Sequence, residues 1–328
     1  MRRVEIDPGA PQAAIIREAA AVLREGGLVA FPTETVYGLG ANALDAGAVD
    51  RIYAAKGRPS YNPLIVHLAH ASEASNVVAT WPDVAQRLAT SFWPGPLTMV
   101  LPKRANVPDS VSAGLRTVGI RVPRHPVAHA LLAAAAIPVA APSANRSMQV
   151  SPTTAAHVMK SLGDADGLVL DGGPTPVGIE STVIDLSGLV PTLLRPGTIS
   201  LPELERVVGA IEVASPSSGT AARKAPGMLD KHYAPRARVI LVSADDAGVR
   251  LEHERASVRR AGAMVIRADV EPAQTVIRMP DTAPAYAARL YETLHSLDDM
   301  QCDVIVIERV PGAAEWMGIA DRLERAAR

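Results

Sequence analysis

The sequence predicts an α/β protein: a mixed, twisted open sheet with packed helices, followed by a smaller α/β domain. Of the 328 residues, 48% are hydrophobic and 20% are charged, which is typical of globular chains and excludes wholesale disorder. Short apolar segments of strand character interleave irregularly with segments whose apolar residues recur at helical spacing. One segment rich in Pro, Gly, Ser and Ala shows neither periodicity and divides the chain.

The first helix is expected over residues 11–25, where apolar residues recur at helical spacing before Gly26 and Gly27. The apolar segment Leu28–Phe31 then predicts a buried strand. Further strands are expected at residues 63–68, 97–101, 118–123, 138–143, 167–171, 181–186 and 191–197. Further helices are expected at residues 46–55, 84–91, 127–136, 155–162 and 202–208.

The last part of the chain has a more regular rhythm. Strands are expected at residues 239–242, 263–267, 275–280 and 303–310, and the clearest helix at residues 285–297. Strands that alternate with helices indicate a small parallel, Rossmann-like sheet. No G-x-G-x-x-G motif accompanies it, so the sequence gives no support for a dinucleotide there.

Charge separates the dividing segment from its neighbours. Residues 1–214 carry 17 Lys and Arg against 18 Asp and Glu, and residues 238–328 carry 12 against 15. Residues 215–237 carry four against one, a sum of +3. We therefore expect a first domain at 1–214, a basic linker at 215–237 and a C-terminal domain at 238–328. The linker is either a solvated tether or a strap over an anionic ligand.

Composition excludes several classes of protein. A net charge of -1 gives no global field for holding nucleic acid or an anionic membrane. The single cysteine, Cys302, excludes a disulfide framework and a Cys-rich zinc site. No membrane-length apolar run and no signal peptide is readable, so a cytoplasmic protein is expected. The motifs of P-loop NTPases, zinc proteases and serine hydrolases are missing as well.

Polar clusters interrupt the ends of predicted strands, where open α/β sheets place ligands. The first, PTETVYGLG at residues 32–40, offers hydroxyls, a carboxylate and two glycines that allow close approach, although a capped turn explains it too. The second, KGRPSYNPLIVH at residues 56–67, holds Lys56 and Arg58 around a glycine before a proline. Lys56 and Arg58 could bind phosphate, or they could simply be a cationic pair favoured by the dipole at a helix C-terminus. His67 could belong to the site or be a buried core histidine.

Two further clusters have the same character. RTVGIRVP at residues 116–123 places Arg121 among apolar strand residues, either on a solvated face or in a cleft. APSANRSMQVSPT at residues 141–153 combines a Pro-Ser-x-Asn turn with a helix start, where free N–H groups can meet anions and where simple capping is the alternative. GIEST at residues 178–182 and RPG at residues 195–197 follow.

PTETVYGLG, KGRPxxNPLIVH, the Pro-Ser-Ala-Asn turn, GIESTVID and LLRPG, in this order, resemble the YrdC-like family of threonylcarbamoyl-AMP synthases. The resemblance covers about the whole chain, because PGM and KHYAP in the linker match the long form with a C-terminal domain. It implies a YrdC-like fold and a nucleotidyltransferase that makes L-threonylcarbamoyladenylate and pyrophosphate from L-threonine, bicarbonate and ATP. That is the first step of the t6A modification of tRNA.

The same resemblance implies a set of site residues. The threonine site would comprise Thr35, His67, Arg121, Ala141 and Ser181. The ATP site would comprise Arg58, Asn62, Thr117, Ser143, Ser151, Arg195 and Tyr233. Lys56 and Arg58 are assigned as catalytic through charge near the phosphates, and Arg121 would grip the amino-acid carboxylate. Mg²⁺ is expected through the ATP phosphates, with no metal ligand on the protein.

The resemblance also implies partners. The product would pass to a tRNA threonylcarbamoyl-transfer complex, and no strong direct binding of tRNA and no membrane is expected. One departure is Leu229-Asp230 in the linker, where more polar or basic residues are expected. Two rival readings are a carbamoyl-transfer domain like that of hydrogenase maturation factors and an RNA-binding module. The missing acylphosphatase and Cys-rich segments oppose the first, and 3% aromatic residues oppose the second.

Overall fold

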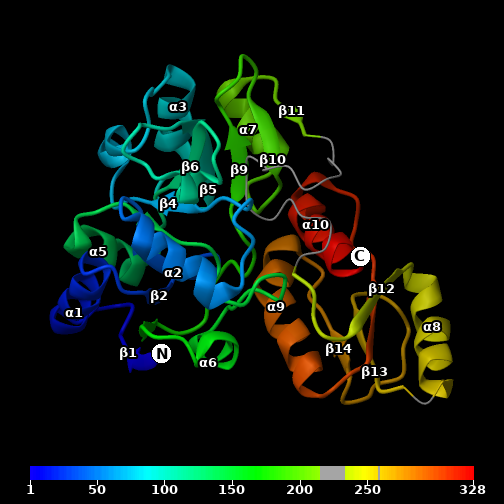
Figure 1. Ribbon diagram of the computed structural model, residues 1–328. Helices are drawn as coiled ribbons and strands as arrows, with labels where there is room; N and C mark the ends of the chain where they lie inside the picture. The colour runs from blue at the N-terminus through cyan, green and yellow to red at the C-terminus, as the bar shows by residue number, and fades with distance from the viewer. Residues whose placement is uncertain (215–232, 258) are drawn as a thin grey trace.

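The computed structural model describes residues 1–214, 233–257 and 259–328. Two sheets organise them, and Figure 1 shows the two units side by side. Most of the expected linker, with Leu229-Asp230, lies outside the described residues, so the predicted domain limits and the strap remain predictions. The α/β class, with a mixed sheet, packed helices and a smaller parallel sheet, is confirmed. None of the described helices is both long enough and apolar enough to cross a bilayer.

The larger sheet has 11 strands in the order β1-β8-β2-β3-β7-β4-β6-β5-β9-β10-β11. They are β1 (Arg2–Glu5), β2 (Val29–Pro32), β3 (Tyr37–Asn42), β4 (Ile65–His67), β5 (Leu97–Pro102), β6 (Thr117–Arg121), β7 (Val139–Ala140), β8 (Leu168–Asp171), β9 (Thr182–Asp185), β10 (Thr192–Arg195) and β11 (Glu212–Val213). The sheet is mixed, with parallel pairs such as β4 with β6 and antiparallel pairs such as β5 with β6.

Helices cover both faces of this sheet. Helices α1 (Ala13–Arg24) and α5 (Pro126–Ala135) share one apolar core with alternate residues of β2 and β8. The other face carries α2 (Ala46–Lys56), α3 (Asp83–Phe92), α4 (Asp109–Ser112), α6 (Ala155–Leu162), α7 (Leu201–Val208) and the 3₁₀ turn η1 (Ala71–Asn76). Successive side chains of a strand point to opposite faces of the sheet. Phe31 therefore packs against α1 and α5, whereas Ala30 packs in the core on the other face.

Strand β3 follows β2 antiparallel, within the segment that the sequence suggested as a polar cluster or a capped turn. The sequence pattern does not predict this strand because two residues of β3 are glycines, which have low strand propensity. Gly40 is required by packing: a Cβ there would lie 2.8 Å from the Phe31 ring and 2.9 Å from Val139. A Cβ at Gly38 would instead lie 3.3 Å from the Cβ of Ala141.

The smaller sheet is parallel throughout, in the order β12-β15-β13-β14. Its strands are β12 (Arg238–Val242), β13 (Ala261–Val265), β14 (Val276–Arg278) and β15 (Val304–Glu308). Helix α8 (Ala244–Ala256) packs on one face. Helices α9 (Ala283–Asp299) and α10 (Met317–Ala326), with η2 (Ala314–Trp316), pack on the other.

Two features of the smaller unit matter below. Its core on the α9 side also contains Val36, Val150 and Ile179, which come from loops of the larger unit. At the carboxyl edge of its sheet, Oε2 of Glu308 accepts the N–H groups of Ile266 at 2.6 Å, Arg267 at 2.9 Å and Ala268 at 3.0 Å. The loop after β13 is therefore closed around a carboxylate of the chain itself.

Candidate active site

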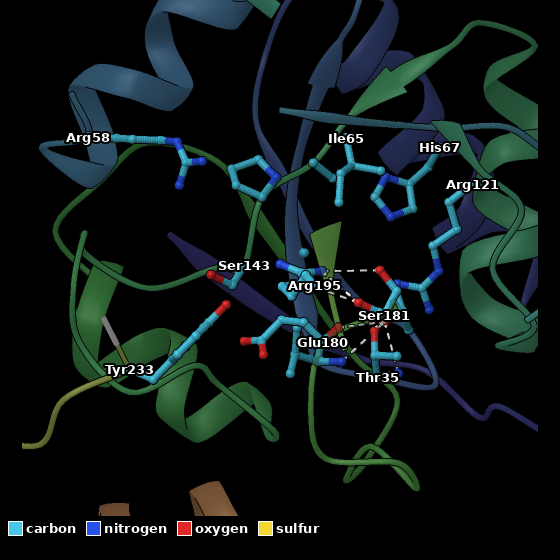
Figure 2. A pocket seen from close by; sticks show the side chains of 15 residues that line it. Thr35, Arg58, Ile65, His67, Arg121, Ser143, Glu180, Ser181, Arg195 and Tyr233 are labelled. Atoms are coloured by element: carbon cyan, nitrogen blue, oxygen red, sulfur yellow. Dashed lines mark hydrogen bonds between the residues drawn. The ribbon is translucent and has the colours of Figure 1, made fainter. Parts of the chain in front are cut away.

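A pocket lies where the polar clusters meet, and residues of the first, second, third and fourth clusters, of GIEST and of RPG all line it. Figure 2 shows side chains from distant parts of the sequence converging on it. The five residues predicted for threonine all line it: Thr35, His67, Arg121, Ala141 and Ser181. Four of those predicted for ATP also line it: Arg58, Ser143, Arg195 and Tyr233. The structure therefore brings together nine residues that are spread over 199 positions, from 35 to 233.

His67 and Arg121 are neighbours because β4 and β6 pair in parallel with these two residues in register. Both side chains consequently lie on one face of the sheet at its pocket edge. The Arg121 guanidinium donates from Nε to the carbonyl of Gly95 at 3.2 Å and from Nη1 to Thr35 Oγ1 at 2.9 Å. Its Nη2 lies 2.7 Å from Oε1 of Glu34. A guanidinium has more N–H groups than these contacts use, so a ligand carboxylate can still be bound.

The other cationic side of the pocket is built from Arg58 and Arg195. Gly57 ends α2 with φ of 58°, a left-handed conformation that suits glycine and turns Arg58 back over the next loop. There Arg58 donates to the carbonyls of Asn62 at 3.0 Å and Pro63 at 2.8 Å. Arg195, at the end of β10, donates from Nε and Nη2 to the carbonyl of Ser181 at 3.1 and 3.0 Å. Both arginines are thus buried and held in fixed orientations.

Burial changes the protonation of this site. The pKa of His67 falls to about 3, first because the ring is desolvated and then because Arg121 is positive. His67 is therefore neutral near pH 7 and can offer a hydrogen bond without adding charge. Desolvation also lowers the pKa of Arg58 to about 10, with Arg195 contributing, so Arg58 remains a cation at neutral pH. The pocket combines fixed positive charge with neutral hydrogen-bonding groups, which suits an anionic substrate.

Four predicted residues are not among those that line the pocket. Lys56 is buried and donates to the carbonyls of Ser143, at 2.6 Å, and Asn145, so it fixes the Pro-Ser-Ala-Asn turn from behind. Ser151 donates to Oε1 of Glu180 at 2.6 Å, beneath the pocket wall. Asn62 supports Arg58 through its carbonyl, and Thr117 begins β6 opposite Pro102. The direct contact of these four side chains with ATP remains a prediction.

Two carboxylates were not assigned from the sequence. Glu34, inside the first motif, pairs with Arg121 and accepts the N–H of Arg124 at 3.1 Å. Glu180, inside GIEST, lines the pocket and pairs with Arg322 of α10. Glu34 lies in the turn between β2 and β3, and β7 and β4 separate β3 from β6, so sequence spacing does not link Glu34 to Arg121. No sequence signal links Glu180 to a residue 142 positions away.

Comparison with known proteins agrees with this geometry. Residues 21–197 match the Sua5/YciO/YrdC family model described as "Telomere recombination", and residues 199–328 match the model of the threonylcarbamoyl-AMP synthase C-terminal domain. The threonylcarbamoyl-AMP synthase of Pyrococcus abyssi is 44% identical over 318 residues, covering 95% of this chain and 94% of that protein. The chain belongs to the threonylcarbamoyl-AMP synthase family.

Further members of this family agree over the full length. The threonylcarbamoyl-AMP synthase of Bacillus subtilis is 42% identical over 331 residues, covering 98% of this chain and 95% of that protein. The crystal structure of P. abyssi Sua5 complexed with L-threonine matches with a TM-score of 0.95 at 40% identity, covering 100% of this chain and 98% of that chain. Membership of the family makes the chain a nucleotidyltransferase-type enzyme, as the resemblance implied.

Proposed function

We propose that this chain converts L-threonine, bicarbonate and ATP into L-threonylcarbamoyladenylate and pyrophosphate, the first step of the t6A modification at position 37 of tRNA. The observation that carries the proposal is the convergence of Arg58, Arg121 and Arg195 on one pocket, in a chain of this family. Three cations around one cavity suit a substrate set with a polyphosphate and a carboxylate.

The reaction brings two anions together. The amine of threonine takes up bicarbonate, with loss of water, to form an N-carboxylate. One oxygen of that carboxylate attacks the α-phosphorus of ATP, and pyrophosphate leaves. Because the nucleophile and ATP repel each other, positioning and local positive charge must supply most of the rate enhancement. We propose no covalent enzyme intermediate.

The amino acid belongs on the side of β4 and β6. There Arg121 grips its carboxylate, while neutral His67 and the hydroxyl of Thr35 offer hydrogen bonds. The backbone of Ala141 and the hydroxyl of Ser181 complete this side. Burial in a mostly apolar frame strengthens each of these contacts relative to water.

The nucleotide belongs on the side of Arg58 and Arg195, whose charges meet the phosphates. The hydroxyl of Ser143 and the phenol of Tyr233 face the same space (Figure 2). Lys56 acts one step further away: it holds the carbonyl of Ser143 and therefore the turn that carries this hydroxyl. We accordingly assign Lys56 a positioning role in addition to its charge.

Mg²⁺ enters this proposal with ATP. Among the residues that the structure describes, no group of three His, Cys, Asp or Glu could hold a metal ion. Glu34 and Glu180 are both paired with arginines. We therefore assign Mg²⁺ to the phosphate oxygens, where it would neutralise charge, and derive no step through it.

The product is an activated carbamoyl donor, so we propose that a tRNA threonylcarbamoyl-transfer complex consumes it. Direct strong binding of tRNA is not part of the proposal, because the net charge of the chain is -1.

The test is turnover by the full chain with threonine, bicarbonate and ATP-Mg²⁺. Pyrophosphate release should require all three substrates, and mass spectrometry should detect the adenylate. The variant Arg58→Ala should abolish most of the release, whereas the matched control Arg146→Ala, which removes an exposed pair with Asp164, should not. Salt-sensitive RNA binding without any turnover would refute the proposal and support the RNA-binding alternative.

A further inference from the structure

Glu180 stands at the junction between the pocket and the smaller unit. It lines the pocket, is 8% exposed, and uses both carboxylate oxygens. Oε1 accepts from Ser151 Oγ at 2.6 Å. Oε2 accepts from the Tyr291 hydroxyl of α9 and from Arg322 Nε of α10, each at 2.9 Å. Burial opposes its ionisation, but Arg322 and Arg195 outweigh this and lower its pKa, so it is a carboxylate at neutral pH.

Arg322, which is 1% exposed, holds two pocket motifs at once. Its Nη2 donates to the carbonyl of Glu180 at 3.3 Å, and its Nη1 donates to the carbonyl of Pro196 at 2.9 Å. Pro196 directly follows Arg195, the predicted phosphate ligand. One guanidinium from the smaller unit therefore fixes the backbone on either side of the nucleotide end of the pocket.

The same two side chains from the smaller unit also hold Tyr233. The Arg322 guanidinium lies 5.2 Å from the centre of the Tyr233 ring, and Tyr291 stacks on that ring with centroids 5.9 Å apart. Such cation–π and aromatic contacts stabilise a defined orientation of the ring. Tyr233 is 1% exposed and lines the pocket, so its phenol is held by the same helices that hold Glu180.

The backbone contacts allow little adjustment. A Cβ at Gly178 would lie 2.2 Å from the carbonyl oxygen of Ala287 in α9. A Cβ at Gly318 in α10 would lie 2.5 Å from the carbonyl oxygen of Gly197. Each helix thus touches the main chain of one pocket motif, GIEST or RPG, and any movement of the helices is transmitted to that motif.

We propose that Glu180, Tyr291 and Arg322 are positioning residues through which the smaller unit sets the places of Arg195 and Tyr233 at the nucleotide end of the pocket. The inference rests on the proposed function, and it assigns to the smaller unit a role in binding ATP. An interface that only holds the two units together would not need a buried ion pair, because apolar side chains of similar volume would stabilise it as well. The threonine end is built mainly on β4 and β6, and within the described part of the chain neither Arg322 nor Tyr291 hydrogen-bonds to His67 or Arg121. Only Ser181, which directly follows Glu180, links it to this junction, so threonine binding should be affected much less than ATP binding.

The experiment compares Arg322→Gln with Arg325→Gln in the full chain. Arg325 lies on the same helix and also pairs with Asp321, so it controls for charge and helix stability. Tyr291→Phe removes only one hydroxyl and keeps the stacked ring, so it carries the test if Arg322→Gln does not fold. Arg322→Lys tests rescue by a retained charge. The measurements are KM for ATP, KM for threonine and kcat, with calorimetric titration of ATP and threonine separately.

For Arg322→Gln we expect KM and Kd for ATP to rise about tenfold or more, with both values for threonine within about twofold of the unmodified chain. Tyr291→Phe should raise the ATP values roughly threefold, Arg322→Lys should recover part of the loss, and Arg325→Gln should change nothing. Unchanged ATP values in both Arg322→Gln and Tyr291→Phe overturn the inference. So does an equal loss of ATP and threonine affinity, which indicates a structural role only. The ATP titration decides this without turnover, so missing pyrophosphate release would refute the proposed function alone.

Discussion

Arg121 and Glu34 form a buried ion pair inside the pocket wall, with Nη2 and Oε1 2.7 Å apart and side chains 5% and 7% exposed. Removing one partner of such a pair leaves a buried charge unpaired, which destabilises strongly. The pair fixes the plane of the guanidinium before any substrate arrives. In the proposed function, Arg121 would thereby be a preformed receptor for the amino-acid carboxylate.

Replacement of Arg121 by lysine should separate charge from geometry. Lysine keeps the positive charge but cannot contact Gly95, Thr35 and Glu34 together in one plane. We expect KM for threonine to rise by about 10- to 100-fold with KM for ATP nearly unchanged. Initial rates of pyrophosphate release at varied threonine provide the measurement. Arg124→Lys, on the adjacent exposed arginine, is the control, and equal effects of the two changes would contradict the prediction.

Arg58→Ala and Arg195→Ala should lose ATP while the fold survives. Each should cost about 2–4 kcal/mol in kcat/KM for ATP if a buried phosphate contact disappears. Thermal unfolding should show a folded protein in both cases, because each arginine donates mainly to loop and strand-end carbonyls. Near-normal kinetics in either variant would remove that residue from the phosphate site.

The amino-acid pocket should reject valine much more strongly than serine. Valine leaves the hydroxyl-binding group of the pocket unpaired, a defect worth up to about 10⁴-fold in kcat/KM. Serine lacks only a methyl group, worth roughly 1 kcal/mol or about tenfold. Competition assays with the three amino acids measure the ratio. Equal use of valine and serine would show that the hydroxyl is not recognised.

Acid should weaken the contact between the two units. His157 of α6 and His295 of α9 stack with centroids 3.8 Å apart. Burial is the first cause that lowers their pKa values, to about 3 and about 4. Lys160 lowers both further and Asp299 opposes it. Since unfolded histidine titrates near pH 6.5, the unfolded chain takes up protons first, and stability falls as the pH drops from about 6.5 toward 4.

Urea unfolding at pH 7, 5.5 and 4.5 measures this loss. In His157→Phe, a ring of similar shape remains but one proton site is gone, so the free energy of unfolding should fall less steeply over the same range. A slope in His157→Phe as steep as in the unmodified chain would exclude this stacked pair as its source.

Gly318→Ala should destabilise the protein although alanine favours helices. The added methyl would lie 2.5 Å from the Gly197 carbonyl oxygen, and overpacking of this kind costs about 1–3 kcal/mol. Gly312→Ala is the matched control, because a Cβ there meets nothing within 4 Å. The difference in unfolding free energy between the two variants is the measurement. A Gly318→Ala protein as stable as the control would show that α10 is not in tight contact with the pocket turn.

The sequence predicted the strands whose apolar residues form unbroken segments, and it predicted the nine pocket residues because they lie in motifs of the family. It missed β3, because Gly38 and Gly40 replace the side chains that mark a strand. The charge of Lys56 is readable from the sequence, and its place near the phosphates stays a prediction, whereas the carbonyls that bind Lys56 could be seen only in the structure. Glu180 escaped assignment because two of its three hydrogen-bond partners, Tyr291 and Arg322, belong to helices more than 100 positions later.

The carboxylate of Glu308 distinguishes the smaller sheet from nucleotide-binding parallel sheets, because it occupies backbone amides at the carboxyl edge. Open parallel sheets commonly receive the phosphate of a cofactor at backbone amides beyond their carboxyl edge. Here three such amides, those of residues 266–268, are already occupied by an internal anion. A soluble phosphate would have to displace a tethered competitor whose effective concentration is very high. The smaller sheet thus resembles a nucleotide-binding sheet whose phosphate-binding amides are already bound by Glu308. In our proposal, the smaller unit acts on the nucleotide through the helices on the other face of this sheet.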